Sequence, residues 1–292
     1  GLAAGGLALG GARTLVVAHR GASAAAPENT LASIGLAWKL GAQGVEFDVQ
    51  RSRDGELFLL HDGTLRRTAG RRCPEALLST GMSQEEYSKL LDVDVSELSY
   101  RDFIRHVDVG AWKDEAFAGQ RPCLLAEAMA QVLSGRFALC EVKSGDAAAA
   151  QELAAAVAAW GWSGDRLALI GFDLEVMAEL KKQLVARSRV DVPVISLKEA
   201  LTEEAARQHV SVAKRAGLDG VDYEANAAVV TREVLAAAKS QGLYIGVWVD
   251  QDNLPDGGDT AQNLSAFDER GLTFFTSDLP AEVCGWMGAA AA

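Results

Sequence analysis

Short runs rich in Val, Ile, Leu and Phe alternate with helical patterns along most of the chain, and this alternation limits the fold more than any other feature. The alternation is typical of repeated βα units with parallel strands. The runs begin near residues 15, 45, 137, 166, 190, 218, 243 and 272, which makes eight. Eight units close a parallel barrel, and they leave no point at which the strand order would reverse, as in an open doubly wound sheet. We therefore predict a (β/α)8 TIM barrel.

The βα rhythm stops between residues 63 and 121, where charged helical fragments such as SQEEYSKLLD replace it. We interpret 63–121 as a small insertion after the second strand, within a single domain that spans 12–288. The first eleven residues are rich in Gly and Ala and lack the positively charged start of a secretory signal. We assign them no element of the predicted barrel.

Net charge and hydropathy exclude two classes of partner. The net charge is −12 and the Lys and Arg residues are scattered, which argues against nucleic-acid binding. No apolar run is long enough to cross a membrane, so we expect no stable membrane insertion. A small anionic substrate stays compatible with the charge, because local cations or a metal can reverse the field in one cleft. We expect a cytoplasmic location, with an exported form as the alternative, and we leave a homodimer open.

Carboxylates occur at the ends of two predicted strands, where a barrel of this type builds its active site. Glu46 and Asp48 are two residues apart and share one face of the second strand, and Glu141 and Lys143 repeat this spacing in the third. Converging carboxylates repel one another unless a cation lies among them, and hard oxygen ligands suit Mg²⁺ or Ca²⁺ better than zinc. We therefore predict a divalent metal on Glu46, Asp48 and Glu141. For either pair alone, a polar strand face or a salt bridge is the alternative.

Two of the four histidines, His19 and His61, end apolar runs beside this acidic set. A histidine pair can divide the roles of general acid and general base, although a single histidine is more often a hydrogen-bonding residue of the structure. His106 and His209 have no such neighbours and receive the structural interpretation. We place His209 on a polar helix face.

Three further residues each have two interpretations. Asn29 could cap the helix that follows it, for which Thr30 competes, or it could contact the site. Trp248, near the end of the seventh run, could stack over a substrate or lie packed under a loop. Asp278 ends the eighth run, where it could belong to the site, hold a nearby histidine or support the barrel floor.

Several segments resemble, in order, the signature segments of the glycerophosphodiester phosphodiesterase family. The main segments are HRGASAAAPENT, VEFDVQRSRDG, LFLLHDGTLRRT and CEVKSG, and VDVGAW, FAGQRPCLLAEAM and TSDLP extend the likeness over roughly 15–280. Two positions depart from the family pattern, with Gly171 where a serine is frequent and Cys123 where a threonine is frequent. We expect the second departure to matter little for chemistry.

The resemblance implies metal-dependent hydrolysis of glycerophosphodiesters to sn-glycerol 3-phosphate and an alcohol. It implies that His19 and His61 are the acid and base, and that Arg20 and Lys143 contact the phosphate, while the three carboxylates hold Mg²⁺ or Ca²⁺. The attacking group is water or a hydroxyl of the substrate itself. The resemblance favours the hydroxyl, which gives a cyclic phosphate first.

Two alternative functions use the same barrel. A phospholipase D-like barrel would act on a lysophospholipid or a phosphosphingolipid and would place an apolar stripe in 63–121, where the sequence has charged fragments. A non-catalytic phosphate-binding barrel would have lost the two histidines or the three acids, and all five are present.

Overall fold

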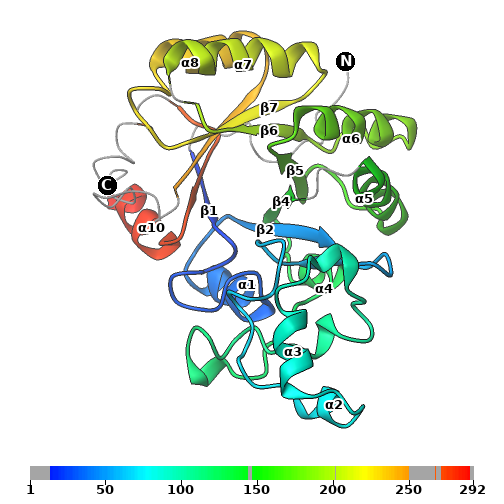
Figure 1. The fold of residues 1–292 in the computed structure, drawn as a ribbon. Coiled ribbons are helices and arrows are strands. Elements are labelled where there is room, and N and C mark those ends of the chain that lie inside the picture. The colour runs from blue at the N-terminus through cyan, green and yellow to red at the C-terminus, as the bar shows by residue number, and fades with distance from the viewer. Residues whose placement is uncertain (1–13, 144–146, 201, 250–266, 268–270, 290–292) are drawn as a thin grey trace.

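The computed structural model describes residues 14–143, 147–200, 202–249, 267 and 271–289, so the Gly- and Ala-rich start lies outside the described residues. Within these ranges eight parallel strands form a closed barrel, as predicted (Figure 1). The strands are β1 (Leu15–Ala18), β2 (Gly44–Arg51), β4 (Phe137–Val142), β5 (Leu167–Gly171), β6 (Val194–Lys198), β7 (Gly220–Glu224), β8 (Tyr244–Trp248) and β9 (Phe274–Ser277).

The first strand closes the barrel, because β1 pairs in parallel with β2 on one side and with β9 on the other. The register between β2 and β4 places Asp48 opposite Glu141, which brings the two carboxylates to the same level of the barrel. A short strand, β3 (Leu57–Leu59), pairs antiparallel with β2 after a turn at Asp54 and Gly55. This hairpin directs the chain toward His61 beside the barrel mouth.

Helices cover the outside of the barrel, and all but the last of those described lie between successive strands (Figure 1). They are α1 (Leu31–Lys39), α4 (Leu125–Ala130), α5 (Ala147–Trp160), α6 (Leu174–Ala186), α7 (Glu203–Arg215), α8 (Arg232–Ser240) and α10 (Pro280–Ala289). No helix in the described ranges is long and apolar enough to span a bilayer. The placement of His209 on a polar helix face is wrong, because its side chain lies on the buried face of α7 with Val210 and Ala213.

The segment between β3 and α4 contains two short helices, α2 (Glu75–Leu78) and α3 (Gln84–Leu90), and three turns of 3-10 helix, Val95–Glu97, Ile104–His106 and Glu115–Phe117. In Figure 1 α2 and α3 lie at the opposite edge of the molecule from α7 and α8. The segment has its own cluster of buried side chains, in which Tyr87 and Phe103 lie with ring centroids 6.0 Å apart.

The barrel interior is filled by side chains at its floor. Phe137 and Phe274 occupy the space beside two glycines, since a Cβ on Gly44 would lie 2.6 Å from the Phe137 ring and one on Gly246 would lie 2.0 Å from the Phe274 ring. Packed aromatic rings leave no room for a ligand at this level. The space that remains is at the carboxyl ends of the strands.

Candidate active site

A cavity of about 190 Å³ opens at the carboxyl ends of the strands. Six of the charged or histidine residues that line it come from β1, β2, the loop after β3, and β4. They are His19, Arg20, Glu46, His61, Glu141 and Lys143. The barrel therefore brings together residues that lie more than a hundred positions apart in the chain.

The three predicted metal ligands form one buried cluster. Glu46, Asp48 and Glu141 each present a carboxylate oxygen within 4.8 Å of the others. Lys143 Nζ lies 2.7 Å from a Glu141 oxygen and 3.1 Å from an Asp48 oxygen. One oxygen of Glu46 accepts the backbone N–H of Arg20 at 2.8 Å, and the other, Oε1, is buried and has no hydrogen-bond partner within the described ranges.

The cluster carries its charge unevenly. Burial raises the pKa of Glu46 well above its usual value, with Asp48 adding to the rise, and burial likewise raises the pKa of Glu141 to about 7. Burial also acts to raise the pKa of Asp48, but Lys143 and Arg20 outweigh it and hold that pKa well below its usual value. A hard divalent cation would relieve this repulsion and take the unpartnered oxygen. The residues present therefore fit a divalent metal.

Asn29 holds Asp48 from the loop before α1. It adopts a left-handed backbone conformation (φ 56°), its side-chain N–H donates to Asp48 Oδ2 at 2.7 Å, and its side-chain oxygen accepts the Asp48 backbone N–H at 3.0 Å. The alternative that Asn29 caps the helix is wrong. Thr30 is the cap, because its hydroxyl accepts the Ser33 N–H at 3.2 Å.

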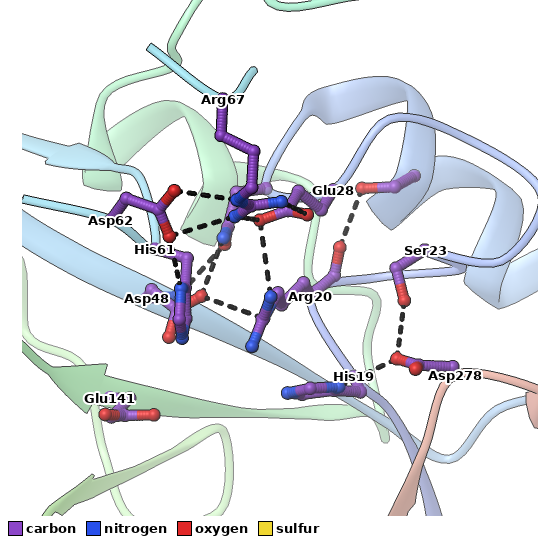
Figure 2. Close-up of polar contacts among 12 residues, drawn as sticks. His19, Arg20, Ser23, Glu28, Asp48, His61, Asp62, Arg67, Glu141 and Asp278 are labelled. Atoms are coloured by element: carbon purple, nitrogen blue, oxygen red, sulfur yellow. Dashed lines mark hydrogen bonds and ion pairs between the residues drawn. The ribbon is translucent and has the colours of Figure 1, made fainter. Parts of the chain in front are cut away.

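His19 is held by a carboxylate from the other end of the chain (Figure 2). Its Nδ1 lies 2.7 Å from Asp278 Oδ1, and the Ser23 hydroxyl donates to the same oxygen at 2.8 Å. Because an ionised carboxylate only accepts hydrogen bonds, Nδ1 carries the proton and Nε2 is left as the basic nitrogen. Asp278 directly follows β9 at the mouth, so the alternative that it supports the barrel floor is wrong.

His61 has an equivalent partner in its neighbour, Asp62, whose Oδ1 lies 2.8 Å from His61 Nδ1 (Figure 2). Arg67 donates to Asp62 at 2.7 Å and to Glu28 at 2.7 Å, and Glu28 lies 3.4 Å from Arg20. The hydrogen bond from His61 and the contact with Arg67 hold the pKa of Asp62 well below its usual range. A continuous set of ion pairs thus runs from His61 to Arg20.

Four of these supporting residues were not among the sequence-predicted site residues. Ser23 and Glu28 lie inside the HRGASAAAPENT segment and Asp62 directly follows His61, so adjacency to a predicted residue was a usable signal. Arg67 lies inside the LFLLHDGTLRRT segment, but its contact with Glu28 depends on the folded chain, which brings the two residues together across 39 positions.

The half of the cavity formed by β5 to β9 has a different lining. Trp248 lies there, with the Phe172 ring edge-on to it at a centroid distance of 6.3 Å. Asp222 is 1% exposed, and neither of its carboxylate oxygens has a hydrogen-bond partner among the described residues. The Thr276 hydroxyl oxygen and the Trp248 ring nitrogen also lack partners. Sequence reasoning missed Asp222, although an acidic residue inside the apolar run LDGVDYEA was a signal.

The fold and the cavity together define a (β/α)8-barrel protein whose mouth carries two carboxylate-held histidines and an acidic candidate metal centre. A sequence model of the glycerophosphoryl diester phosphodiesterase family matches residues 19–281. The chain belongs to this family.

Individual relatives agree with this assignment. A glycerophosphodiester phosphodiesterase of Caldanaerobacter subterraneus is 37% identical over 134 residues, a match that covers 46% of each chain and thus less than half of the relative's length. Among solved structures, a glycerophosphodiester phosphodiesterase from Agrobacterium tumefaciens superposes with a TM-score of 0.70 at 24% identity, covering 93% of this chain and 99% of that one. A phosphodiesterase from Oleispira antarctica, solved in complex with the product sn-glycerol-3-phosphate, superposes with a TM-score of 0.73 at 20% identity, over 94% and 97% of the two chains.

Proposed function

We propose that this protein hydrolyses glycerophosphodiesters to sn-glycerol 3-phosphate and an alcohol, with His19 and His61 as general acid and base. The observation that carries the proposal is that both histidines, two carboxylates of the acidic cluster and two cationic side chains line one cavity, with Asp48 beside them. Membership of the family supports the reaction class, and the product bound to the Oleispira antarctica phosphodiesterase supports the glycerol phosphate half of the substrate.

Glu46, Asp48 and Glu141 are the residues that would hold Mg²⁺ or Ca²⁺. When bound, such an ion supplies positive charge to the phosphoryl oxygens and offsets the carboxylates around it. Arg20 and Lys143 border this cluster, with Arg20 Nε 3.4 Å from Asp48 and Lys143 Nζ 2.7 Å from Glu141. Their charges would bind the phosphodiester and stabilise the negative charge that grows on it.

The two histidines divide the proton transfers. One neutral imidazole accepts the proton of the attacking hydroxyl as the new P–O bond forms, and the other, protonated, donates its proton to the alcohol oxygen as the old P–O bond breaks. If the attacker is the neighbouring hydroxyl of the substrate, a cyclic phosphate forms, and water then opens it with the histidine roles exchanged. The carboxylates on Nδ1 keep each Nε2 available for these transfers.

The first test is release of sn-glycerol 3-phosphate from glycerophosphocholine and glycerophosphoethanolamine with Mg²⁺, with Ca²⁺ and with excess chelator. We expect release with at least one ion and none with chelator. His19→Ala and His61→Ala should each lower kcat about a hundredfold or more, because a positioned acid or base contributes that much. Full activity of either folded variant would refute its role in proton transfer.

A further inference from the structure

Asp222 is a buried carboxyl group with no hydrogen-bond partner in the part of the chain that the structure describes. Its side chain lines the cavity from β7, it is 1% exposed, and neither oxygen accepts a hydrogen bond. The backbone N–H of Tyr223 lies close enough to lower the pKa in part, but burial outweighs it and raises the pKa of Asp222 well above its usual value. A buried polar group without a partner is uncommon and costly, and it points to a ligand that completes it.

The cationic side chains described in the cavity lie on the side opposite Asp222. Arg20 and Lys143 line the half built from β1, β2 and β4, and both contact carboxylates there. Among the described lining residues of the β5 to β9 half there is no Lys, Arg or His, and there are two acidic residues, Asp222 and Glu199. One half of the cavity thus suits an anionic phosphate, whereas the other half has two carboxyl groups and no described cation to pair with them.

Aromatic rings accompany these carboxyl groups. Trp248 lines the same half of the cavity, and Phe172, which is 44% exposed, lies edge-on to it. An indole ring attracts an ammonium group to its face, and it does so more strongly when water is excluded. A neutral alcohol could donate a hydrogen bond to Asp222, but it would not offset the charge of an ionised carboxylate and would not use the ring face.

We infer that the β6 to β8 side of the cavity binds an ammonium group on the leaving alcohol, with Asp222 as its counter-ion and Trp248 against it. The inference rests on the proposed function, because it concerns the part of the diester beyond the phosphate. The substrate class would then be zwitterionic glycerophosphodiesters, in which the negative phosphate faces Arg20 and Lys143. A primary ammonium, as in ethanolamine, and a quaternary one, as in choline, share this chemistry.

The test compares kcat/KM for glycerophosphocholine and glycerophosphoethanolamine with kcat/KM for glycerophosphoglycerol, whose leaving alcohol is neutral. Asp222→Asn keeps the shape of the side chain and removes its charge. We expect it to lower kcat/KM for both cationic substrates about tenfold or more and to leave glycerophosphoglycerol within about twofold. Asp173→Asn, which removes a carboxylate that caps α6 outside the cavity lining, is the matched control and should leave the ratio unchanged. Thermal unfolding checks that both variants fold.

A loss only for choline would restrict the site to quaternary ammonium groups. An equal loss for all three substrates would overturn the inference, because Asp222 would then contact the glycerol half that they share. No loss for any of them would overturn it as well. If the wild-type protein hydrolyses none of the three, the proposed function fails, and calorimetric binding of glycerophosphocholine and glycerophosphoglycerol to the wild-type and Asp222→Asn proteins still decides the inference by the same ratio.

Discussion

His19 and His61 are each fixed at Nδ1 by a carboxylate, but the two carboxylates are supported differently. Asp278 accepts a hydrogen bond from the Ser23 hydroxyl. Asp62 instead accepts hydrogen bonds from the Arg67 guanidinium, which also donates to Glu28. A carboxylate on Nδ1 sets the tautomer and the direction of the ring, and the loss of such a partner typically costs more in turnover than in binding.

At this scale we predict that Asp278→Asn lowers kcat about ten- to a hundredfold with little change in KM, because the amide can hold the ring in the wrong tautomer. Steady-state kinetics on glycerophosphocholine would measure this split. Ser23→Ala should have a smaller effect in the same direction, since Asp278 keeps its contact with His19. A rise in KM at constant kcat would instead place Asp278 in substrate binding.

Helix α7 is joined to β6 and β7 through one buried histidine. His209 Nε2 lies 2.9 Å from the Ser196 hydroxyl and Nδ1 lies 3.1 Å from the Tyr223 hydroxyl, which itself donates to Ala206 O at 2.9 Å. The Tyr223 hydroxyl donates its proton to Ala206 O, so its oxygen accepts the hydrogen bond from His209 Nδ1–H. With the proton on Nδ1, Nε2 of the neutral ring accepts the hydrogen bond from the Ser196 hydroxyl. This arrangement requires a neutral ring.

Burial, with a smaller contribution from Lys198, lowers the pKa of His209 to about 4. The unfolded chain binds this proton more tightly, with a pKa near 6.5, so the stabilisation is complete above pH 6.5 and falls as the pH drops toward 4. We predict that wild-type protein loses about 2 kcal/mol more unfolding free energy than His209→Gln between pH 7.5 and pH 5. Urea unfolding at the two pH values measures the difference. Parallel losses in the two proteins would contradict it.

Across the whole molecule, the mouth of the barrel concentrates buried negative charge in a chain whose net charge is −12. A metal that binds the folded mouth but not the unfolded chain stabilises the entire barrel, because the strands that hold Glu46, Asp48 and Glu141 unfold with it. Metal binding should therefore be visible as global stability.

We predict that saturating Mg²⁺ or Ca²⁺ raises the unfolding free energy by about 2 to 3 kcal/mol and the Tm by about 5 °C or more. Glu141→Gln should abolish most of this shift, whereas Glu85→Gln, on the exposed side of α3, should keep it. Differential scanning calorimetry with and without each ion makes the measurement. An unchanged wild-type Tm with both ions would argue against a metal at this cluster.

The positions of the eight strands and the acidic cluster could be read from the sequence, because both depend on local periodicity. Apolar runs bounded by helical patterns define strands, and residues two apart on a strand share a face, as Glu46 and Asp48 do. The placement of His209 could not be read in this way, because the polar atoms that satisfy it come from β6 and β7.

Several contacts of the site were decided only by the tertiary structure. Asp278 reaches His19 across 259 positions because β9 pairs with β1, and Arg67 returns to Asp62 and Glu28 through the folded segment after β3. By itself the sequence determined the alternating elements and the residues at the strand ends. The tertiary structure decided which of these residues meet, and it left Asp222 without a hydrogen-bond partner among the residues described. Both outcomes depend on how eight strands twist around one axis, and no local sequence pattern contains that property.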